Sequence, residues 1–256
     1  MLLLLAASCS EAPTTPTPSR TPQLNATRFV AFGDSITAGV LATACPIGGG
    51  VNCSAPPAST MSVMRRKYEL QRLFADLEAS TSSYPRLLQS LLAARYTTQS
   101  PSIANEGNPG EFVADGKLRL PAALAPAPQV LLLQEGANDM NQGGPAVTAI
   151  VEDLRTMVRE GRTRGMTVFV GTLLPQRPNA CRGYDFCDGT NDTVATNTRI
   201  RTMVTAEGAT LVDLYPAFDG QTSTLIGLDG LHPNEAGYQK MADLFFEAIR
   251  LRLELP

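Results

Sequence analysis

Hydrophobic residues along the chain follow two different patterns. Some segments are short and mostly apolar, which is typical of strands buried on both faces of a parallel sheet. In other segments the apolar positions recur every three or four residues, as on one face of an amphipathic helix. The short runs predict strands at residues 29–32, 130–133, 166–175 and 209–214, and a further short strand is expected around residues 98–104.

The helical pattern fills most of the segments between these runs. It predicts helices at residues 61–79, 83–96, 146–165, 193–207 and 234–253, with Ser83 and Asn234 as candidate N-caps. Strands that alternate with helices favour a parallel sheet covered by helices on both sides. We therefore predict an α/β fold of about five strands, in one domain over residues 27–256.

The first 26 residues have a different composition, and we predict that they lie outside this domain. Residues 1–9 are apolar and end in small residues, like the end of a secretory signal peptide. The tetrapeptide Ala6-Ala7-Ser8-Cys9 resembles a bacterial lipobox, in which the cysteine becomes lipidated. Residues 10–26 are rich in proline and threonine, as in an extended tether behind a membrane anchor. We expect an exported envelope lipoprotein, and the alternatives are a plain secretion signal or an apolar tail.

The cysteines agree with export. Beyond Cys9, four remain, in two close pairs that an oxidising compartment would join. The predicted disulfides are Cys45–Cys53 and Cys181–Cys187. Three pairings are possible in principle, and four unpaired thiols in a cytosolic protein are the alternative.

Composition and charge exclude several classes of function. Apolar residues make up 43% of the chain and charged residues 18%, which is a globular composition. The formal net charge of −3 gives no basic face for nucleic acid. With one histidine and scattered cysteines, the sequence has no cluster of transition-metal ligands and no calcium-binding loop.

Polar residues follow the predicted strands where a parallel sheet presents its carboxyl ends. Gly33-Asp34-Ser35 follows the first strand, Asn105-Glu106-Gly107 the second and Gly136-Ala137-Asn138-Asp139 the third. Asp229 and His232 come after the last strand, beyond a loop. Ligands of open α/β sheets bind outside the carboxyl ends of the strands, so we expect these residues to gather on one rim.

Three of these residues have the chemistry of a nucleophilic hydrolase. A serine hydroxyl is a poor nucleophile until a base takes its proton, and imidazole, which titrates near neutral pH, suits that task. His232 is the only histidine in 256 residues, and Asp229 is three residues away from it. We predict Ser35 as the nucleophile, His232 as the base and Asp229 as the carboxylate that orients the base.

The oxyanion of a tetrahedral intermediate also needs hydrogen-bond donors. The candidates are the backbone N–H groups of Ser35 and Gly107 and the side chain of Asn138. Taken alone, each motif is more typical of an ordinary turn than of a catalytic site, and only their joint occurrence at strand ends favours chemistry. We interpret Asp34 and Asp139 as structural carboxylates that accept hydrogen bonds from turn amides.

As a set, the motifs resemble those of the SGNH hydrolases, also called GDSL esterases or lipases. The matching motifs are Gly33-Asp34-Ser35, Gly107 within Asn-Glu-Gly-Asn-Pro-Gly, Gly136-Ala137-Asn138-Asp139, and Asp229-Gly230-Leu231-His232. The resemblance runs from Phe29 to the last helix, and it implies a flavodoxin-like three-layer α/β/α fold without metal or organic cofactor. It also implies Ser35 as nucleophile, His232 as base, Asp229 as its orienting residue, and an oxyanion hole of the Ser35 backbone, Gly107 and Asn138. No Gly-x-Ser-x-Gly elbow surrounds Ser35, so the α/β-hydrolase superfamily is not supported.

Two segments are candidate walls of the site. Residues 41–82 are longer than in a minimal member of that family and contain the Cys45–Cys53 pair. They form either a flap that shapes the substrate pocket or a surface elaboration remote from it. Residues 176–192, with Cys181 and Cys187, follow a strand end and could form another wall.

The leading hypothesis is an exported serine esterase that cleaves lipid, aryl or acylated-carbohydrate esters through an acyl-enzyme. An acyltransferase with the same acyl-enzyme is one alternative. A non-catalytic envelope protein that binds glycans or lipids is the alternative from another class. A protein that only binds would not need Ser35, Asp229 and His232 together.

Overall fold

A computed structural model describes residues 21–41, 82–141, 147–177 and 192–256. Within them, the five predicted strands form one parallel sheet in the order β2-β1-β3-β4-β5. The strands are β1 (Arg28–Gly33), β2 (Ser102–Gly107), β3 (Val130–Gln134), β4 (Thr167–Gly171) and β5 (Thr210–Val212). This is the flavodoxin-like strand order, so the predicted fold class is confirmed.

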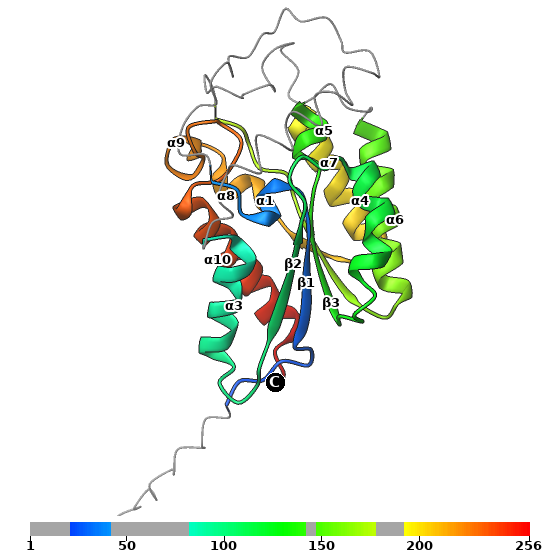
Figure 1. Ribbon diagram of the computed structural model, residues 1–256, viewed down its shortest axis with the longest axis vertical. Coiled ribbons are helices and arrows are strands. Elements are labelled where there is room, and N and C mark those ends of the chain that lie inside the picture. Colours follow the sequence, from blue (N-terminus) through cyan, green and yellow to red (C-terminus); the bar gives the residue numbers. More distant parts are fainter. Residues whose placement is uncertain (1–20, 42–81, 142–146, 178–191) are drawn as a thin grey trace, which may run out of the picture.

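Helices cover both faces of the sheet (Figure 1). On one face lie α3 (Tyr84–Arg95) and α10 (Glu235–Leu253), and on the other lie α4 (Val113–Ala123), α6 (Val147–Thr163) and α7 (Asp192–Ala206). Alternate residues of β3 pack against the two helix layers. Val130 and Leu132 belong to one hydrophobic cluster, and Leu131 and Leu133 belong to the other. The uninterrupted apolar run of this strand therefore reflects burial on both faces.

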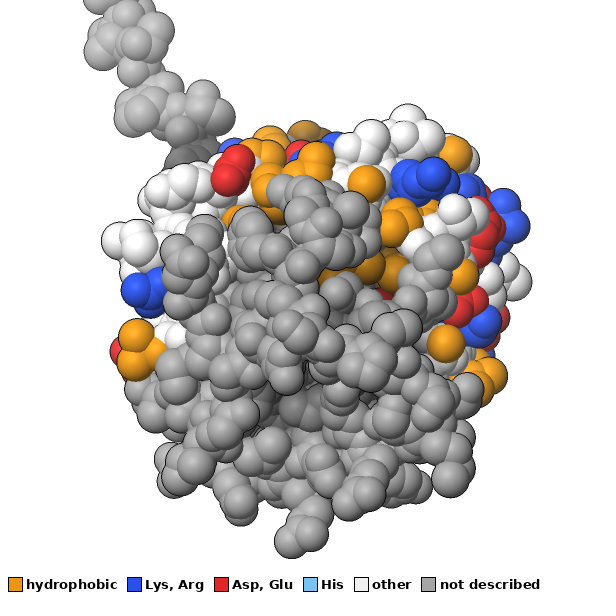
Figure 2. Space-filling view, turned by 90° about the horizontal axis from the view of Figure 1, so that it is seen from above, with side chains coloured by type: hydrophobic (Ala, Val, Ile, Leu, Met, Phe, Trp, Pro, Cys, Tyr) orange, Lys and Arg blue, Asp and Glu red, His pale blue; other side chains and the backbone are white. Residues whose placement is uncertain are grey.

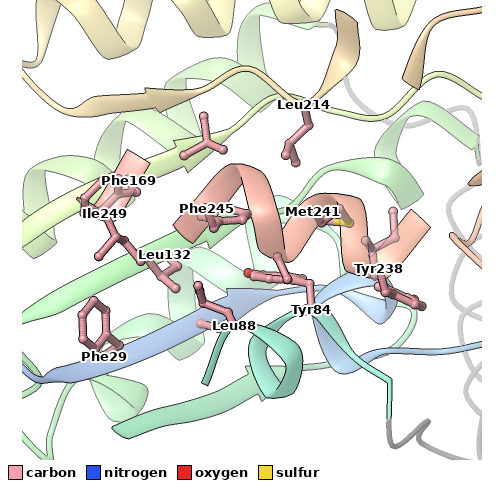
Figure 3. Close-up of a cluster of buried hydrophobic side chains, with 14 of the residues drawn as sticks. Phe29, Tyr84, Leu88, Leu132, Phe169, Leu214, Tyr238, Met241, Phe245 and Ile249 are labelled. Atoms are coloured by element: carbon pink, nitrogen blue, oxygen red, sulfur yellow. The ribbon is translucent and has the colours of Figure 1, made fainter. Parts of the chain in front are cut away.

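The core under α3 and α10 explains why the last helix is apolar every four residues. Ile249 of α10 lies beside Leu132 and Phe169 of the sheet, and Phe245 and Met241 follow along the helix in the same buried cluster (Figure 3). Tyr84 of α3 stacks on Phe245 with ring centroids 4.9 Å apart. This contact ties the two helices of the layer to each other as well as to the sheet.

Four short helices lie at the carboxyl end of the sheet (Figure 1). They are α1 (Ser35–Ala38), α5 (Ala137–Asn141), α8 (Tyr215–Phe218) and α9 (Thr222–Leu225). α1 and α5 begin within three residues of the ends of β1 and β3, the central strands. Viewed from this end, the visible described side chains around the periphery mix hydrophobic, basic and acidic residues (Figure 2).

The predicted helices at 83–96, 146–165, 193–207 and 234–253 correspond to α3, α6, α7 and α10. Asn234 caps α10 as predicted, since its Oδ1 accepts a hydrogen bond of 3.0 Å from Gly237 N–H. Ser83 stands at the N-cap of α3 without a side-chain cap bond. The predicted helix at 61–79, the lipidation site Cys9 and both cysteine pairs lie outside the described residues.

Among the long helices of the described residues, α4 was not predicted. It contains Gly116 and Pro121, two residues that disfavour helix interiors. Its apolar residues Val113 and Leu120 are buried against the sheet, and this packing outweighs the local preference. The helix matters for the site because it follows β2 and faces the carboxyl ends of the central strands.

The domain also begins before the predicted boundary at residue 27. Leu24 is only 3% exposed and forms an antiparallel bridge with Glu254. Asn25 N–H donates at 2.9 Å to the carbonyl of Leu253, the last residue of α10. This contact could not be predicted from the sequence, because the segment is rich in proline and a single buried leucine forms no periodic pattern.

Candidate active site

Ser35 is the first residue of α1, directly after the turn that ends β1. The turn requires glycine at position 33, because a Cβ there would lie 1.8 Å from the Gln134 carbonyl oxygen of the neighbouring strand. Asp34 caps the helix, with its Oδ1 accepting 2.9 Å from Ile36 N–H. The predicted nucleophile therefore stands on a fixed turn at the centre of the carboxyl rim.

The structure brings Ser35, His232 and Asp229 together, as the sequence predicted. His232 Nε2 lies 2.8 Å from Ser35 Oγ, and His232 Nδ1 lies 2.5 Å from Asp229 Oδ2. All three residues are at most 1% exposed. A carboxylate can only accept, so Nδ1 carries the ring proton and leaves Nε2 as the acceptor for the serine hydroxyl.

A short hairpin holds the histidine in place. Ile226 and Pro233 pair in an antiparallel bridge, and Gly227 N–H donates to the His232 carbonyl at 2.8 Å. Gly230, in the turn of this hairpin, has a φ of +84°, a backbone conformation that glycine adopts without strain. The hairpin thus closes on itself and presents His232 toward the end of β1.

The carboxylate of Asp229 binds both the hairpin backbone and the histidine ring. Its Oδ1 accepts hydrogen bonds from Leu231 N–H at 3.0 Å and His232 N–H at 3.1 Å, while Oδ2 binds the ring. Burial raises the pKa of Asp229, but the hydrogen bond and charge of His232 and the two backbone donors together lower the pKa below its usual value. The carboxylate is consequently ionised beside the imidazole at neutral pH.

Asp34 links the nucleophile turn to the third motif. Its Oδ2 accepts from Gly136 N–H at 3.3 Å and Ala137 N–H at 3.2 Å, at the start of α5. Burial nevertheless keeps the pKa of Asp34 above its usual value. One side chain therefore fixes Ser35 relative to the segment that carries Asn138, and the predicted structural role of Asp34 is confirmed.

The structure does not support the oxyanion role predicted for Gly107. Its N–H already donates to Asn105 Oδ1 at 3.0 Å. A Cβ on Gly107 would lie 2.1 Å from Ala38 N, so glycine is needed for the close approach of β2 to α1. By contrast, the N–H of Ser35 has no hydrogen-bond acceptor among the described residues.

A second glycine of the same motif is a better candidate donor. Asn108, Pro109, Gly110 and Glu111 form a turn in which Glu111 N–H donates to the Asn108 carbonyl at 3.2 Å and Gly110 has a φ of +79°. Gly110 N–H has no acceptor in the described part of the chain, and Asn138 Nδ2 donates to the adjoining Glu111 carbonyl at 2.9 Å. The Asn-Pro-Gly-Glu sequence was the available signal, because proline and glycine at the centre are typical of a type II turn.

Two further carboxyl groups lie buried next to this turn. Neither oxygen of Glu135 has a hydrogen-bond partner in the described part of the chain, and the carboxyl occupies the space that a Cβ on Gly116 of α4 would need. Burial, with the charges of nearby carboxylates, raises the pKa of Glu135 well above its usual value. Burial also raises the pKa of Asp139 to about 7, although its Oδ2 accepts from Val113 N–H at 3.1 Å. The surroundings of Glu135 and Asp139 therefore favour the neutral form of these two carboxyl groups more than water does.

The described residues contain no group of three or more histidine, cysteine, aspartate and glutamate side chains arranged to hold a metal ion. Nor does any helix in the described ranges combine the length and the apolar character needed to cross a membrane.

Comparison with solved structures gives neighbours of the same fold. A lipase/acylhydrolase from Enterococcus faecalis is 23% identical, with a TM-score of 0.65 over 89% of this chain and 97% of the other. LAE5, a hydrolase from the Lake Arreo metagenome, is 22% identical, with a TM-score of 0.62 over 87% and 94%. The acetylxylan esterase Axe2 from Geobacillus stearothermophilus is 19% identical, with a TM-score of 0.60 over the same shares. No curated protein matches the chain.

The assignment of the chain to a family rests on its match to a protein-family model. The model of the GDSL-like Lipase/Acylhydrolase family matches residues 31–240, from the fourth residue of β1 into α10. The match spans most of the chain and includes Ser35, Asn138 and His232, so the resemblance inferred from the motifs is confirmed. The chain therefore belongs to the GDSL-like lipase/acylhydrolase family and is a serine carboxylic ester hydrolase.

Proposed function

We propose that the enzyme cleaves its ester through an acyl-Ser35 intermediate, with His232 as general base and acid. As Ser35 Oγ attacks the ester carbonyl carbon, its proton passes to His232 Nε2. The tetrahedral intermediate then expels the alcohol, which takes that proton from His232. A water molecule activated by the same imidazole attacks the acyl-serine, and Ser35 is regenerated as the acid leaves.

In this proposal three donors stabilise the oxyanion: the N–H groups of Ser35 and Gly110 and the side chain of Asn138. The first two have no other acceptor among the described residues, and all three belong to segments joined by Asp34 or by the Glu111 carbonyl. Donors fixed before the reaction stabilise developing charge without reorganising, which is why their positions matter.

The observation that carries the proposal is the contact between Ser35 and His232. Their side chains meet at 2.8 Å although they are 197 positions apart in the sequence, and the second ring nitrogen meets Asp229 at 2.5 Å. A structural hydrogen bond alone would not require a nucleophile, a base and an ionised carboxylate in one line, next to the Ser35 N–H, which has no acceptor among the described residues.

Hydrolysis of p-nitrophenyl esters from acetyl to palmitoyl tests this proposal, together with covalent labelling by a fluorophosphonate. We expect the wild type to hydrolyse at least one ester and to be labelled, and Ser35→Ala to lose both. Ser90→Ala is the matched control, because Ser90 is an exposed residue of α3 whose hydroxyl bonds only its own helix, to Arg86 O. A wild type that neither labels nor hydrolyses any ester would contradict the proposal.

An apolar substituent of the ester is proposed to bind beside the histidine hairpin. A hollow of about 400 Å³ there is lined in part by Leu41, Ile226 and Leu228, and Leu228 directly precedes Asp229. Leu228 is 52% exposed, so a charged side chain fits at this position without entering the core. We expect Leu228→Asp to raise KM for the octanoyl ester and to leave KM for the acetyl ester unchanged, and equal KM changes would place the substituent elsewhere.

Export and membrane anchoring remain part of the proposal and rest on the sequence. The apolar leader, Cys9 in a lipobox-like tetrapeptide and the tether behind it support lipidation. Metabolic labelling of the full chain with an alkyne fatty acid should mark the wild type and not Cys9→Ser. Alkylation with and without prior reduction, followed by peptide mass analysis, tests the proposed Cys45–Cys53 and Cys181–Cys187 disulfides.

A further inference from the structure

Glu111 lies where the oxyanion turn joins α4, and both ends of the residue hold neighbouring segments. Its backbone carbonyl accepts from Asn138 Nδ2 at 2.9 Å. Its carboxylate accepts from Asn108 Nδ2 at 2.8 Å and from Arg119 Nε and an Nη at 2.9 and 2.7 Å. The side chain is only 3% exposed. The last residue of the turn therefore carries a buried carboxylate that is paired with one guanidinium and bonded to the first residue of the turn.

Arg119 connects this carboxylate to the ends of two strands. The Nη that binds Glu111 also donates to the Glu106 carbonyl at 2.9 Å and approaches the Gly33 carbonyl at 3.5 Å. The guanidinium carbon lies 4.0 Å from the ring centroid of Phe32. The planar guanidinium is thus held by the last residues of β1 and β2, immediately before the nucleophile turn.

We propose that Glu111 and Arg119 are positioning residues for the oxyanion hole. The inference rests on the proposed function and names residues that the motifs did not include. The paired carboxylate and guanidinium fix the turn that presents Gly110 N–H, and the Glu111 carbonyl fixes the amide of Asn138. Neither side chain contacts the reacting atoms of Ser35 or His232 in the structure, so both act through the donors.

The fork shape of the guanidinium is essential to this role. Two parallel N–H···O bonds determine the orientation of the carboxylate as well as its distance, and an ammonium group cannot reproduce them. Loss of the guanidinium would leave the buried Glu111 carboxylate without a positively charged partner. The carboxylate would then move toward water. The turn would move with it, and the donors would no longer match the oxyanion of the transition state.

The test compares Arg119→Met, Arg119→Lys and Glu111→Gln with the wild type. We expect Arg119→Met to lower kcat by about tenfold to a hundredfold with KM changed by less than about threefold, since removing one oxyanion donor outright costs about 10²–10³ in kcat. Arg119→Lys should recover part of kcat, and Glu111→Gln should lose less than Arg119→Met. Affinity for an alkyl trifluoromethyl ketone, which forms a tetrahedral adduct with the serine, should fall in parallel with kcat.

Arg95→Met is the matched control. Arg95 binds Glu254 through Nε and an Nη at 2.7 Å each, the same forked geometry, near the C-terminus at the opposite end of the sheet. It should lower the melting temperature without changing kcat per active site. Titration with a fluorophosphonate counts the competent sites, so a purely structural defect would reduce their number and leave kcat per site unchanged.

Three results would overturn the inference. One is a kcat per site within threefold of the wild type for Arg119→Met, and another is an equal effect of Arg95→Met. If Arg119→Met does not fold, Arg119→Lys and Glu111→Gln decide, and unchanged kcat and ketone affinity in both would be the third. An inactive wild type that matches Ser35→Ala would instead refute the proposed function itself, so the two failures are distinguishable.

Discussion

The two halves of the active site are built in opposite ways. The histidine half is one hairpin, residues 226–233, in which both oxygens of Asp229 have hydrogen-bond partners within three residues. The oxyanion half joins three segments, at residues 34–35, 108–111 and 136–139, through Asp34 and Glu111. It also contains buried carboxyl oxygens without any partner, on Glu135 and Asp139. The first half is therefore a self-contained unit, and the second depends on how distant segments pack.

The pKa of Asp229 in the histidine half is lowered, whereas the pKa values of Glu135 and Asp139 in the oxyanion half are raised. His232 and the backbone donors lower the pKa of Asp229 in spite of burial, so Asp229 stabilises the fold at neutral pH and this contribution is lost on acidification. Burial raises the pKa of Glu135 and Asp139, so their contribution is complete at low pH and is lost as pH rises through their folded-state pKa values. Acidification should therefore reduce the stabilising contribution of Asp229, and a rise in pH should reduce the contribution of Glu135 and Asp139.

The largest effect is expected in the histidine half, from His232→Ala. No other histidine exists in the chain, so no second imidazole can take the proton of Ser35. By comparison with base-deleted serine hydrolases, kcat should fall by about 10⁵- to 10⁶-fold. Steady-state hydrolysis of an aryl ester measures this, with circular dichroism as the check on folding. A folded variant with kcat within about tenfold of the wild type would show that the imidazole is not the base.

Asp229→Asn should have the next largest effect, about 10⁴-fold on kcat. The asparagine oxygen can keep the hydrogen bonds from Leu231 and His232 N–H, so the hairpin should persist. Its amide donates to the ring instead of accepting, which places the ring proton on Nε2 and removes the acceptor for Ser35. The melting temperature near neutral pH should fall far less than kcat does. If the two losses were proportionate, the role of Asp229 would be mainly structural.

In the oxyanion half, Asn138→Ala should lower kcat by about 10²- to 10³-fold with little change in KM. The loss is smaller than in the histidine half because proton transfer remains and only one donor disappears. Michaelis–Menten kinetics on one aryl ester for the three variants give the ranking directly. A change in KM alone would mean that Asn138 binds the substrate and does not stabilise the transition state.

The smallest effect concerns stability, and it sharpens the contrast in pH dependence. Glu135→Gln removes a carboxyl whose raised pKa favours the folded state at low pH, so the variant should gain stability relative to the wild type as pH rises. Thermal unfolding from about pH 5 to pH 9 should show a difference that grows toward alkaline pH. Glu152→Gln, at an exposed position of α6, is the control and should show no such trend. A constant difference across the range would mean that Glu135 does not titrate.

The same contrast explains which site residues could be predicted. Asp229 and His232 lie three residues apart, and the hairpin around them is local, so their contact follows from short-range sequence alone. Ser35 could be placed on the same rim because it follows a recognisable buried strand. Gly110, Glu111 and Arg119 belong to contacts between segments, and neither periodicity nor spacing indicates which of two glycines keeps an unoccupied N–H.

The fold shows a similar division. Strands β1, β3 and β4 were predictable because burial on both faces leaves apolar runs, as in residues 130–133 of β3, whereas β2 is more polar and partly exposed. Helix α4 was not predicted because Gly116 and Pro121 lower the local helix propensity. The packing of its apolar residues on the sheet outweighs this local preference. Leu24 was assigned to the tether because its only signal is the contact with Glu254 at the far end of the domain.

The sequence by itself determined the layered α/β architecture and the placement of Ser35, Asp229 and His232 at one rim of the sheet, because these follow from apolar periodicity, from the ends of buried strands and from neighbours a few residues away. Only the tertiary structure decided the strand order, which glycine N–H near Ser35 lacks an acceptor among the described residues, and the direction in which burial shifts the pKa values of Glu135 and Asp139. Those features depend on atoms brought together from distant segments, where burial and the presence or absence of one hydrogen-bond partner determine whether a group is charged or free to donate.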